Sequence, residues 1–67
     1  MVYEAFNYET NVRAAVMLYE GAFDVAAFDL DSGLMVAFKS FAVKSRAIEY
    51  AAKFVADEIP AGTYAPL

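Results

Sequence analysis

Residues 23–41, FDVAAFDLDSGLMVAFKSF, decide the fold of this 67-residue chain. The segment Asp31-Ser32-Gly33 at their centre predicts a three-residue hairpin loop, because such loops place a glycine in the left-handed conformation. Apolar residues continue on both sides of the loop for the length of a strand. Residues 23–30 and 34–40 are therefore expected to form an antiparallel pair.

The register across this loop sorts the side chains onto two faces. One face receives the pairs Phe23–Phe41, Val25–Lys39, Ala27–Ala37 and Asp29–Met35. The other face receives the pairs Ala26–Phe38, Phe28–Val36 and Leu30–Leu34. The second face is almost purely apolar, so we expect a helix to cover it.

A similar three-residue turn at Glu20-Gly21-Ala22 predicts a third strand over residues 12–19. Its register places Arg13 opposite Asp29, which brings opposite charges together. A slip of one residue would invert every side chain and place Arg13 beside Phe28. We therefore predict the first of these registers, with Val16 and Leu18 on the face that the helix covers and Met17 and Tyr19 on the other.

The beginning of the chain leaves two alternatives open. Residues 10–20 also fit the helical period with Gly21 as the C-cap, although a strand is the favoured assignment. Residues 1–11 alternate imperfectly and predict either a short edge strand or a loosely held arm.

A helix is expected after the strands. Apolar residues recur at helical spacing from Ser45 to Ile59, while charged residues take the opposite face. Ser45 is a suitable N-cap, and Pro60 should end the helix at or just before it. Residues 60–67 form a tail that would either add a short strand or fray.

Together these features predict an α+β domain: a three-stranded antiparallel meander over residues 12–40 with one C-terminal helix, 45–59, on one face. A further short strand at either terminus would extend the sheet. A chain of 67 residues leaves room for a single domain.

Composition argues against catalysis. The chain contains no cysteine and no histidine, which excludes disulfides, thiol nucleophiles, histidine-based triads and the usual zinc sites. Residues 29–33 resemble the start of a calcium loop, but the glycine comes one residue early and Ser40 stands where the last ligand should be. We expect a protein that is not an enzyme and holds no cofactor or metal.

No stretch of about 20 apolar residues is present that could form a membrane helix. The longest candidate, residues 12–30, is interrupted by four charged side chains. The first residues carry no positive charge of the kind that begins a signal peptide. We expect a cytoplasmic protein that does not bind a membrane.

The chain is unusually apolar, with 61% hydrophobic residues, and its charge is unevenly placed. Residues 1–31 hold six acids and one base, a local charge of −5, whereas residues 32–67 sum to +1. The sheet face opposite the helix should therefore be an apolar, acidic surface that binds a protein partner. Its predicted contact residues are Met17, Tyr19, Phe23, Val25, Met35, Phe41, Glu20, Asp24 and Asp29.

Two other coverings of that face remain open. Residues 1–11 would complete a second small core if they folded across it, and a second copy of the chain would form a homodimer packed sheet on sheet. A structural homo-oligomer subunit would need no other partner.

A single-stranded nucleic-acid binder is the alternative function. Residues 39–53 carry Lys39, Lys44, Arg46 and Lys53 against one acid, and exposed aromatic rings on a sheet can stack bases. The acidic character of the whole chain argues against nucleic acid as the partner.

The C-terminal half resembles a known family in outline. The helix AIEYAAKFVADE followed by IPAGTY is similar to the small acidic bacteriophage inhibitor of bacterial RNA polymerase, which has a Pro-Ala-Gly turn after its helix. The matching residues are Ala47, Ala51 and Pro60-Ala61-Gly62, over about half of the chain. The resemblance implies a phage-type accessory protein that inhibits a host protein by covering part of its surface in the host cytoplasm.

Overall fold

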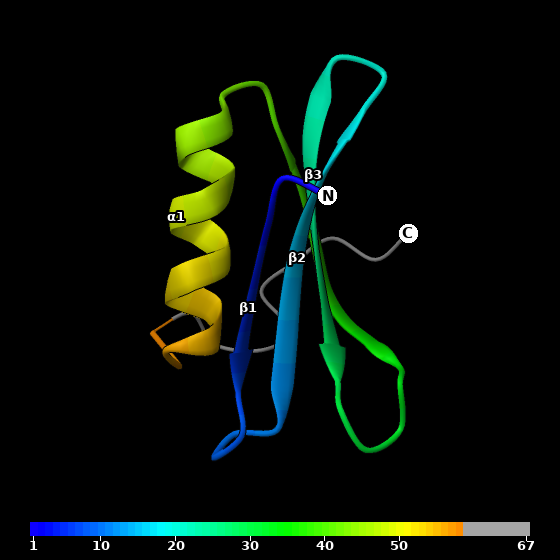
Figure 1. The fold of residues 1–67 in the computed structure, drawn as a ribbon, viewed down its shortest axis with the longest axis vertical. Coiled ribbons are helices and arrows are strands. Elements are labelled where there is room, and N and C mark those ends of the chain that lie inside the picture. The colour runs from blue at the N-terminus through cyan, green and yellow to red at the C-terminus, as the bar shows by residue number, and fades with distance from the viewer. Residues whose placement is uncertain (59–67) are drawn as a thin grey trace.

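The computed structural model describes residues 1–58 and shows a four-stranded antiparallel sheet with one helix packed across one face (Figure 1). The sheet order follows the chain, β1-β2-β3-β4, so each strand lies beside the next. The elements are β1 (Tyr3–Asn7), β2 (Val12–Tyr19), β3 (Ala22–Asp29), β4 (Met35–Phe41) and α1 (Lys44–Val55). The predicted α+β meander with a C-terminal helix is confirmed, whereas the number of strands is four instead of three.

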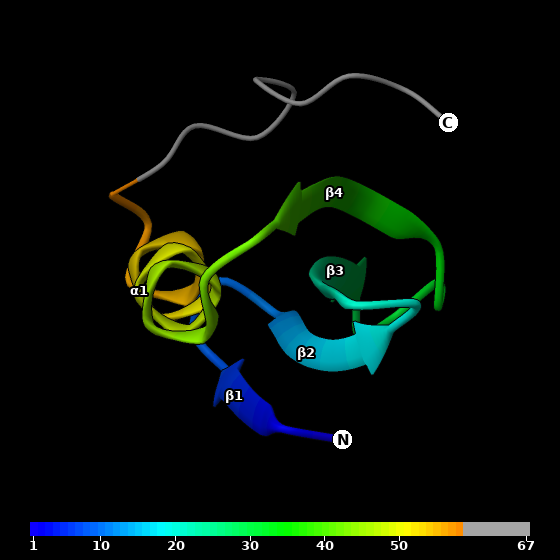
Figure 2. The same cartoon turned by 90° about the horizontal axis from the view of Figure 1, so that it is seen from above.

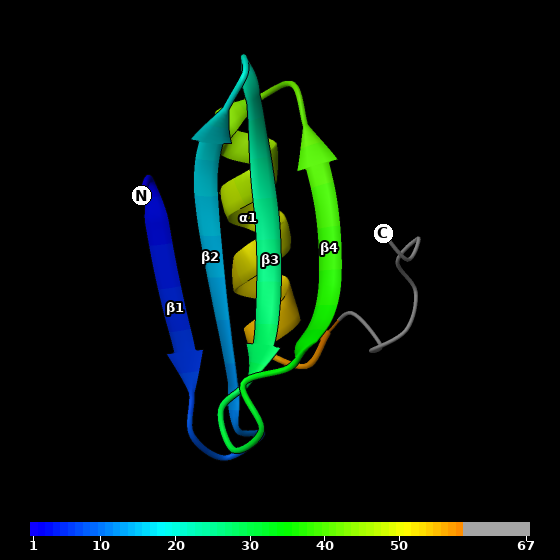
Figure 3. The same cartoon turned by 90° about the vertical axis from the view of Figure 1, so that its right-hand side faces the viewer.

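The additional strand comes from the segment whose assignment was open. β1 pairs with β2, with Tyr3 opposite Val16 and Ala5 opposite Ala14. Figure 3 shows β1 at the outer edge of the sheet, on the far side of β2 from β3 and β4. The N-terminal segment therefore adds a fourth strand at the edge of the sheet and does not fold across the sheet face turned away from α1. Residues 12–19 form a strand, so the helical alternative is wrong.

Asn7 joins the first hairpin to the helix. Its side-chain oxygen accepts hydrogen bonds from the backbone N–H groups of Glu9 (2.9 Å) and Thr10 (3.3 Å), which close the turn after β1. Its Nδ2 donates to the carbonyl oxygen of Val55 at 2.5 Å. That carbonyl is one of the last four in α1, which have no partner within the helix. The Asn7 side chain thus provides hydrogen-bond partners both for the backbone N–H groups of the turn and for a carbonyl at the end of α1.

The register between β2 and β3 differs from the prediction by one residue. Arg13 lies opposite Phe28, and Leu18 lies opposite Phe23. The cause is a two-residue turn: Glu20 and Gly21 have φ values of 48° and 80°. Positive φ at both central residues matches a type I′ turn, whose twist fits that of the flanking strands.

The register between β3 and β4 follows the prediction over most of its length. Phe23 pairs with Phe41, and Ala27 pairs with Ala37. The register shifts just beyond Ala27, so that Phe28 pairs with Met35 instead of Val36. The predicted Leu30–Leu34 and Asp29–Met35 pairs are therefore wrong. Gly33 has the expected positive φ of 74°, and the Asp29 N–H donates to the Leu34 carbonyl oxygen at 2.9 Å.

These two registers decide which side chains the helix covers. The hydrophobic core lies between α1 and the sheet, and it consists of Ala14, Val16, Val25, Ala27, Ala37, Ala47, Ala51, Phe54 and Val55. Phe23 and Phe41 pack against this core from the sheet. The predicted assignment of faces is therefore wrong for β3 and β4, because it placed Phe28 and Phe38 beneath the helix. β2 keeps its predicted faces.

Alanine dominates this core, and the largest fully buried side chains are only Val16 and Val25. Ala14, Ala27 and Ala37 line the sheet where α1 crosses, and small side chains on both elements let a helix approach a sheet closely. Figure 2, seen from above, shows α1 beside a sheet that curves strongly. The core is small, as expected for a domain of this size.

The helix begins one residue earlier than predicted and ends four residues earlier. Val43 is the N-cap and makes no side-chain hydrogen bond, so Ser45 is not the cap. At the other end Asp57 has a positive φ of 64°. The N–H of Asp57 donates to the Phe54 carbonyl and the N–H of Glu58 to the Lys53 carbonyl, which is the hydrogen-bond pattern of a Schellman motif. The predicted ending at Ile59–Pro60 and the tail lie outside the described residues.

Candidate protein-binding surface

The candidate surface is the sheet face turned away from α1, here called the open face. The side chains at its register positions are Glu4, Phe6, Arg13, Ala15, Met17, Tyr19, Ala22, Asp24, Ala26, Phe28, Met35, Phe38 and Ser40. Figure 3 looks onto this face, with α1 behind the strands. No helix or strand of residues 1–58 covers it.

Large apolar side chains on the open face remain in contact with solvent. The exposed fractions are 62% for Tyr19, 45% for Met17, 39% for Met35 and 44% for Phe6. A sheet face in water normally carries polar residues in alternation with the buried ones. Here aromatic rings and methionines occupy those positions, and both are residue types that protein interfaces favour.

The centre of the open face is well packed despite having no layer above it. Ala15 is only 4% exposed, and it lies opposite Ala26 on β3 and Glu4 on β1. Phe28 and Phe38 are half-buried on the same face. Phe38 lies opposite Ala26, and Phe28 lies at a position diagonal to Ala15. The open face is therefore a packed surface in which larger side chains surround small alanine residues.

Arg13 is held in this surface by two neighbours. Its Nε forms an ion pair with Glu4 Oε2 at 2.5 Å, and its guanidinium carbon lies 5.7 Å from the centre of the Phe28 ring. The other end of β1 contributes a ring pair: Phe6 stacks on Tyr8 with 5.8 Å between ring centres. The one-residue change in register, which was not predicted because it places Arg13 beside Phe28, thus produces a cation–π contact.

Asp24 occupies the other half of the open face. It lies opposite Met17 on β2 and opposite Ser40 on β4. The Ser40 hydroxyl donates a hydrogen bond to its carboxylate. Tyr19 on β2 and Phe38 on β4 lie at positions diagonal to it, within reach for aromatic side chains.

The structure brings four of the nine predicted contact residues together. Met17, Tyr19, Asp24 and Met35 lie on the open face, and Glu20 lies in the turn at its end. Phe23, Val25 and Phe41 belong to the opposite face, where Val25 is 1% exposed, so their assignment as contact residues is corrected. Their place is taken by Phe6, Phe28 and Phe38. A two-residue turn at Glu20-Gly21 would have indicated Phe28 and Phe38, and the pairing of β1 with β2 would have indicated Phe6.

Asp29 closes the loop between β3 and β4. Hydrogen bonds from the Ser32 hydroxyl (2.8 Å) and the Ser32 N–H (3.0 Å) lower the pKa of the Asp29 carboxyl below its ordinary value of 3.8. Asn11 donates a longer bond of 3.5 Å to the same side chain. Within residues 1–58, no three acidic side chains are grouped to hold a metal ion. Asp29, which the sequence predicted as a contact residue, is thus engaged in hydrogen bonds of the turn between β3 and β4.

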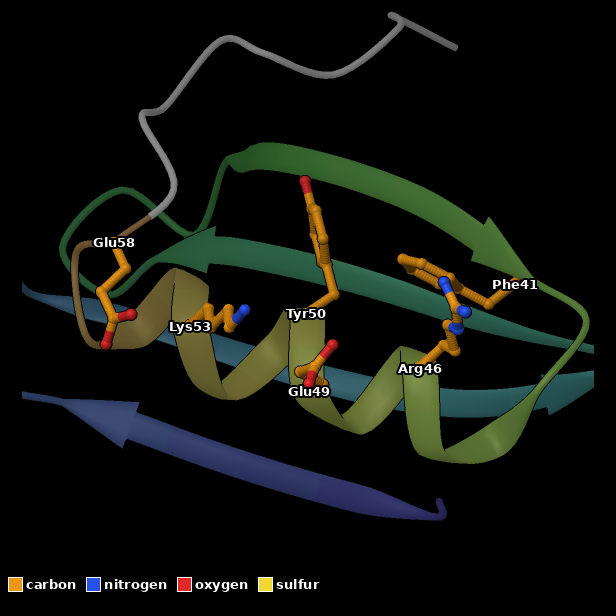
Figure 4. A pocket seen from close by; sticks show the side chains of 6 residues that line it. All are labelled: Phe41, Arg46, Glu49, Tyr50, Lys53 and Glu58. Atoms are coloured by element: carbon orange, nitrogen blue, oxygen red, sulfur yellow. The ribbon is translucent and has the colours of Figure 1, made fainter.

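A second surface feature lies between α1 and β4, a hollow of about 350 Å³ shown in Figure 4. It is lined by Phe41, Arg46, Glu49, Tyr50, Lys53 and Glu58. The Lys39 ammonium lies 5.5 Å from the centre of the Phe41 ring and 5.7 Å from that of Tyr50. Burial raises the pKa of the Tyr50 hydroxyl. The hollow mixes both signs of charge.

The cationic side chains proposed for nucleic-acid binding lie apart from the exposed aromatic side chains of the open face. Lys44, Arg46 and Lys53 lie on α1, and Lys39 reaches the rings on the helix side of the sheet. The exposed aromatic residues of the open face lie on the other side. A single strand of nucleic acid would not contact both features at one place on the sheet.

Comparisons with protein-family models, with curated proteins and with solved structures find no match for this chain. No helix in the described part of the chain is long and apolar enough to cross a membrane.

Proposed function

We propose that this protein is a non-catalytic binding module whose open face docks on a partner protein and covers part of that partner's surface. An inhibitor or modulator acts in this way. The resemblance of the C-terminal half to phage inhibitors points to the same class of function, although its Pro60-Ala61-Gly62 segment lies outside the described residues.

The observation that carries the proposal is the exposure of Met17, Tyr19 and Met35 on one continuous sheet face. β1 was the described segment best placed to cover that face, and it extends the sheet instead. Aromatic and methionine side chains supply large contact areas, and tyrosine is frequent among the residues that dominate binding energy. Because Ala15 at the centre of the face is already packed, little of the surface would have to rearrange on binding.

The experiment is capture of partners by the immobilised full-length chain, with mass spectrometry to identify them and titration to measure affinity. Tyr19→Ala should weaken binding of the captured protein at least tenfold, since truncating an interface anchor typically costs more than about 1.4 kcal/mol.

Leu18→Ala is the matched control. Leu18 is the neighbour of Tyr19 on β2 and is 59% exposed against 62%, but it lies on the opposite face of the strand. Binding should change less than twofold in this variant. Equal losses in both variants, or no specific partner at all, would contradict the proposal. A concentration-dependent dimer in light scattering, with Tyr19→Ala restoring the monomer, would instead assign the face to self-association.

A further inference from the structure

The fold separates the charges of the chain onto two sides. Acidic side chains border the open face and the turns at its ends: Glu4, Glu9, Glu20, Asp24 and Asp31. Of the five lysines and arginines, Arg13 alone lies on the open face. Lys44, Arg46 and Lys53 lie on α1, and the ammonium of Lys39 on β4 lies 5.7 Å from the centre of the Tyr50 ring on α1.

Arg13 shows how the open face holds a cation. Its guanidinium contacts a carboxylate, Glu4, and lies over an aromatic ring, Phe28. Both groups attract a cation, and together they hold it in one orientation. The half of the open face around Arg13 therefore already contains a cation of the chain itself.

The half around Asp24 has the same chemical groups without the cation. Asp24 presents a carboxylate that accepts one hydrogen bond, from Ser40. The rings of Tyr19 and Phe38 stand at its diagonal positions. The ion pair between Arg13 and Glu4 is the one salt bridge of the described residues, so no side chain among them neutralises Asp24.

We propose, on the basis of the function proposed above, that the open face binds a basic segment of a partner protein, and that an arginine or lysine of this segment contacts Asp24 between Tyr19 and Phe38. Acidic residues around the face would attract such a segment and orient it during the encounter. A second copy of this chain is a poorer occupant, because packing two open faces together would bring Glu4 and Asp24 of each copy, with the acidic turns at the ends of the face, against only one arginine of each.

The test selects ligands without assuming their sequence. A library of random twelve-residue peptides is panned on the immobilised full-length chain, and the affinities of the enriched peptides are measured by titration. Enriched peptides should combine lysine or arginine with aromatic or aliphatic residues, and their binding should weaken at least tenfold between about 50 and 500 mM salt. Enrichment of neutral or acidic peptides, or of none, would overturn the proposal of a basic partner.

Two variants that lose one negative charge each locate the contact. Asp24→Asn keeps an oxygen that can accept the Ser40 hydrogen bond, and it should weaken binding of the basic peptides at least tenfold. Glu49→Gln makes the same change in net charge on the exposed side of α1 and should change affinity less than twofold. Equal effects of the two variants would refute a specific contact at Asp24.

Tyr19→Ala separates failure of this proposal from failure of the proposed function. If neutral peptides are enriched and Tyr19→Ala abolishes their binding, the open face binds proteins but the partner is not basic. If Tyr19→Ala leaves all selected peptides bound, the open face is not the binding surface and both proposals fail.

Discussion

Phe41 and Tyr19 form a matched test of which sheet face is core. Both are aromatic residues near a strand end, but Phe41 packs under α1 with its ring 5.4 Å from that of Tyr50, whereas Tyr19 is 62% exposed on the open face. Complete burial of a phenylalanine contributes roughly 1.5–3 kcal/mol, and truncating a fully buried one costs about 3–5 kcal/mol with the cavity included. Phe41 is half-buried, so Phe41→Ala should cost about 2–3 kcal/mol.

This loss is large for so small a domain. At roughly 0.05–0.15 kcal/mol per residue, the free energy of unfolding of the whole chain should be about 3–10 kcal/mol. Each kcal/mol corresponds to about 4–8 °C in the melting temperature of a domain of this size, so Phe41→Ala should lower it by roughly 8–24 °C. Tyr19→Ala should cost less than about 1 kcal/mol, the range of strand propensities at exposed positions.

Urea unfolding followed by circular dichroism measures both free energies, and the slope of each transition checks that unfolding remains cooperative. The reasoning would be refuted if Tyr19→Ala destabilised the chain as much as Phe41→Ala. That result would mean that a further layer covers the open face. It would also be refuted by a Phe41→Ala variant as stable as the wild type, because α1 would then not pack where the structure places it.

Three further perturbations test the local structure. Glu20→Asn should raise the free energy of unfolding by about 0.5–1 kcal/mol in urea titrations, because asparagine tolerates the positive φ of 48° better than glutamate does; a loss of stability would contradict the two-residue turn. Asn7→Ala should lower the free energy of unfolding by about 1–2 kcal/mol through the lost hydrogen bonds. Asn7→Asp should also be less stable than the wild type, since aspartate cannot donate a hydrogen bond to the Val55 carbonyl. An Asn7→Asp variant as stable as the wild type would show that only the hydrogen bonds in the turn matter. Ser32→Ala removes the main cause of the lowered pKa of Asp29, so NMR titration should show that pKa rising toward 3.8. The stability that this lowered pKa contributes is present above the ordinary pKa and lost as the pH falls through the folded-state value, so wild type and Ser32→Ala should differ at pH 7 and converge in acid.

Sequence reasoning identified the elements of this fold because each has a strong local signal. The hairpin around Gly33 follows from a turn signal between two apolar runs, and its register was correct from Phe23–Phe41 to Ala27–Ala37. The period of apolar residues located α1 to within one residue at its start. Charge along the chain also placed six of the nine acidic residues in residues 1–31, before the helix.

The open face was harder to predict, because it depends on single-residue differences. A three-residue turn at Glu20 would pair Arg13 with Asp29, and only the two-residue turn gives the pairing with Phe28. Ion pairing favoured the first register, whereas backbone twist and the contact of Arg13 with both Glu4 and Phe28 stabilise the second. Pairwise charge matching across two strands could not include Glu4, since β1 was not assigned as a partner of β2.

The sheet face that forms the core was difficult to predict because its central residues are alanines. A helix was expected over the largest apolar side chains, yet α1 lies over Ala14, Ala27 and Ala37. Close approach of the backbones compensates for the small side chains there, and the bulkier Phe28 and Phe38 are left on the open face. Hydrophobicity summed over a face therefore does not identify the core when both faces are apolar.

The central claim is that the open face is accessible in the free chain and covered by a partner protein. Hydroxyl-radical footprinting with mass spectrometry measures this directly on the wild-type monomer, free and bound to the captured partner. Met17, Tyr19 and Met35 should react in the free chain and be protected in the complex, while Leu18 on the opposite face of β2 should react equally in both. Protection of the three residues already in the free monomer, or full reactivity in the complex, would contradict the account.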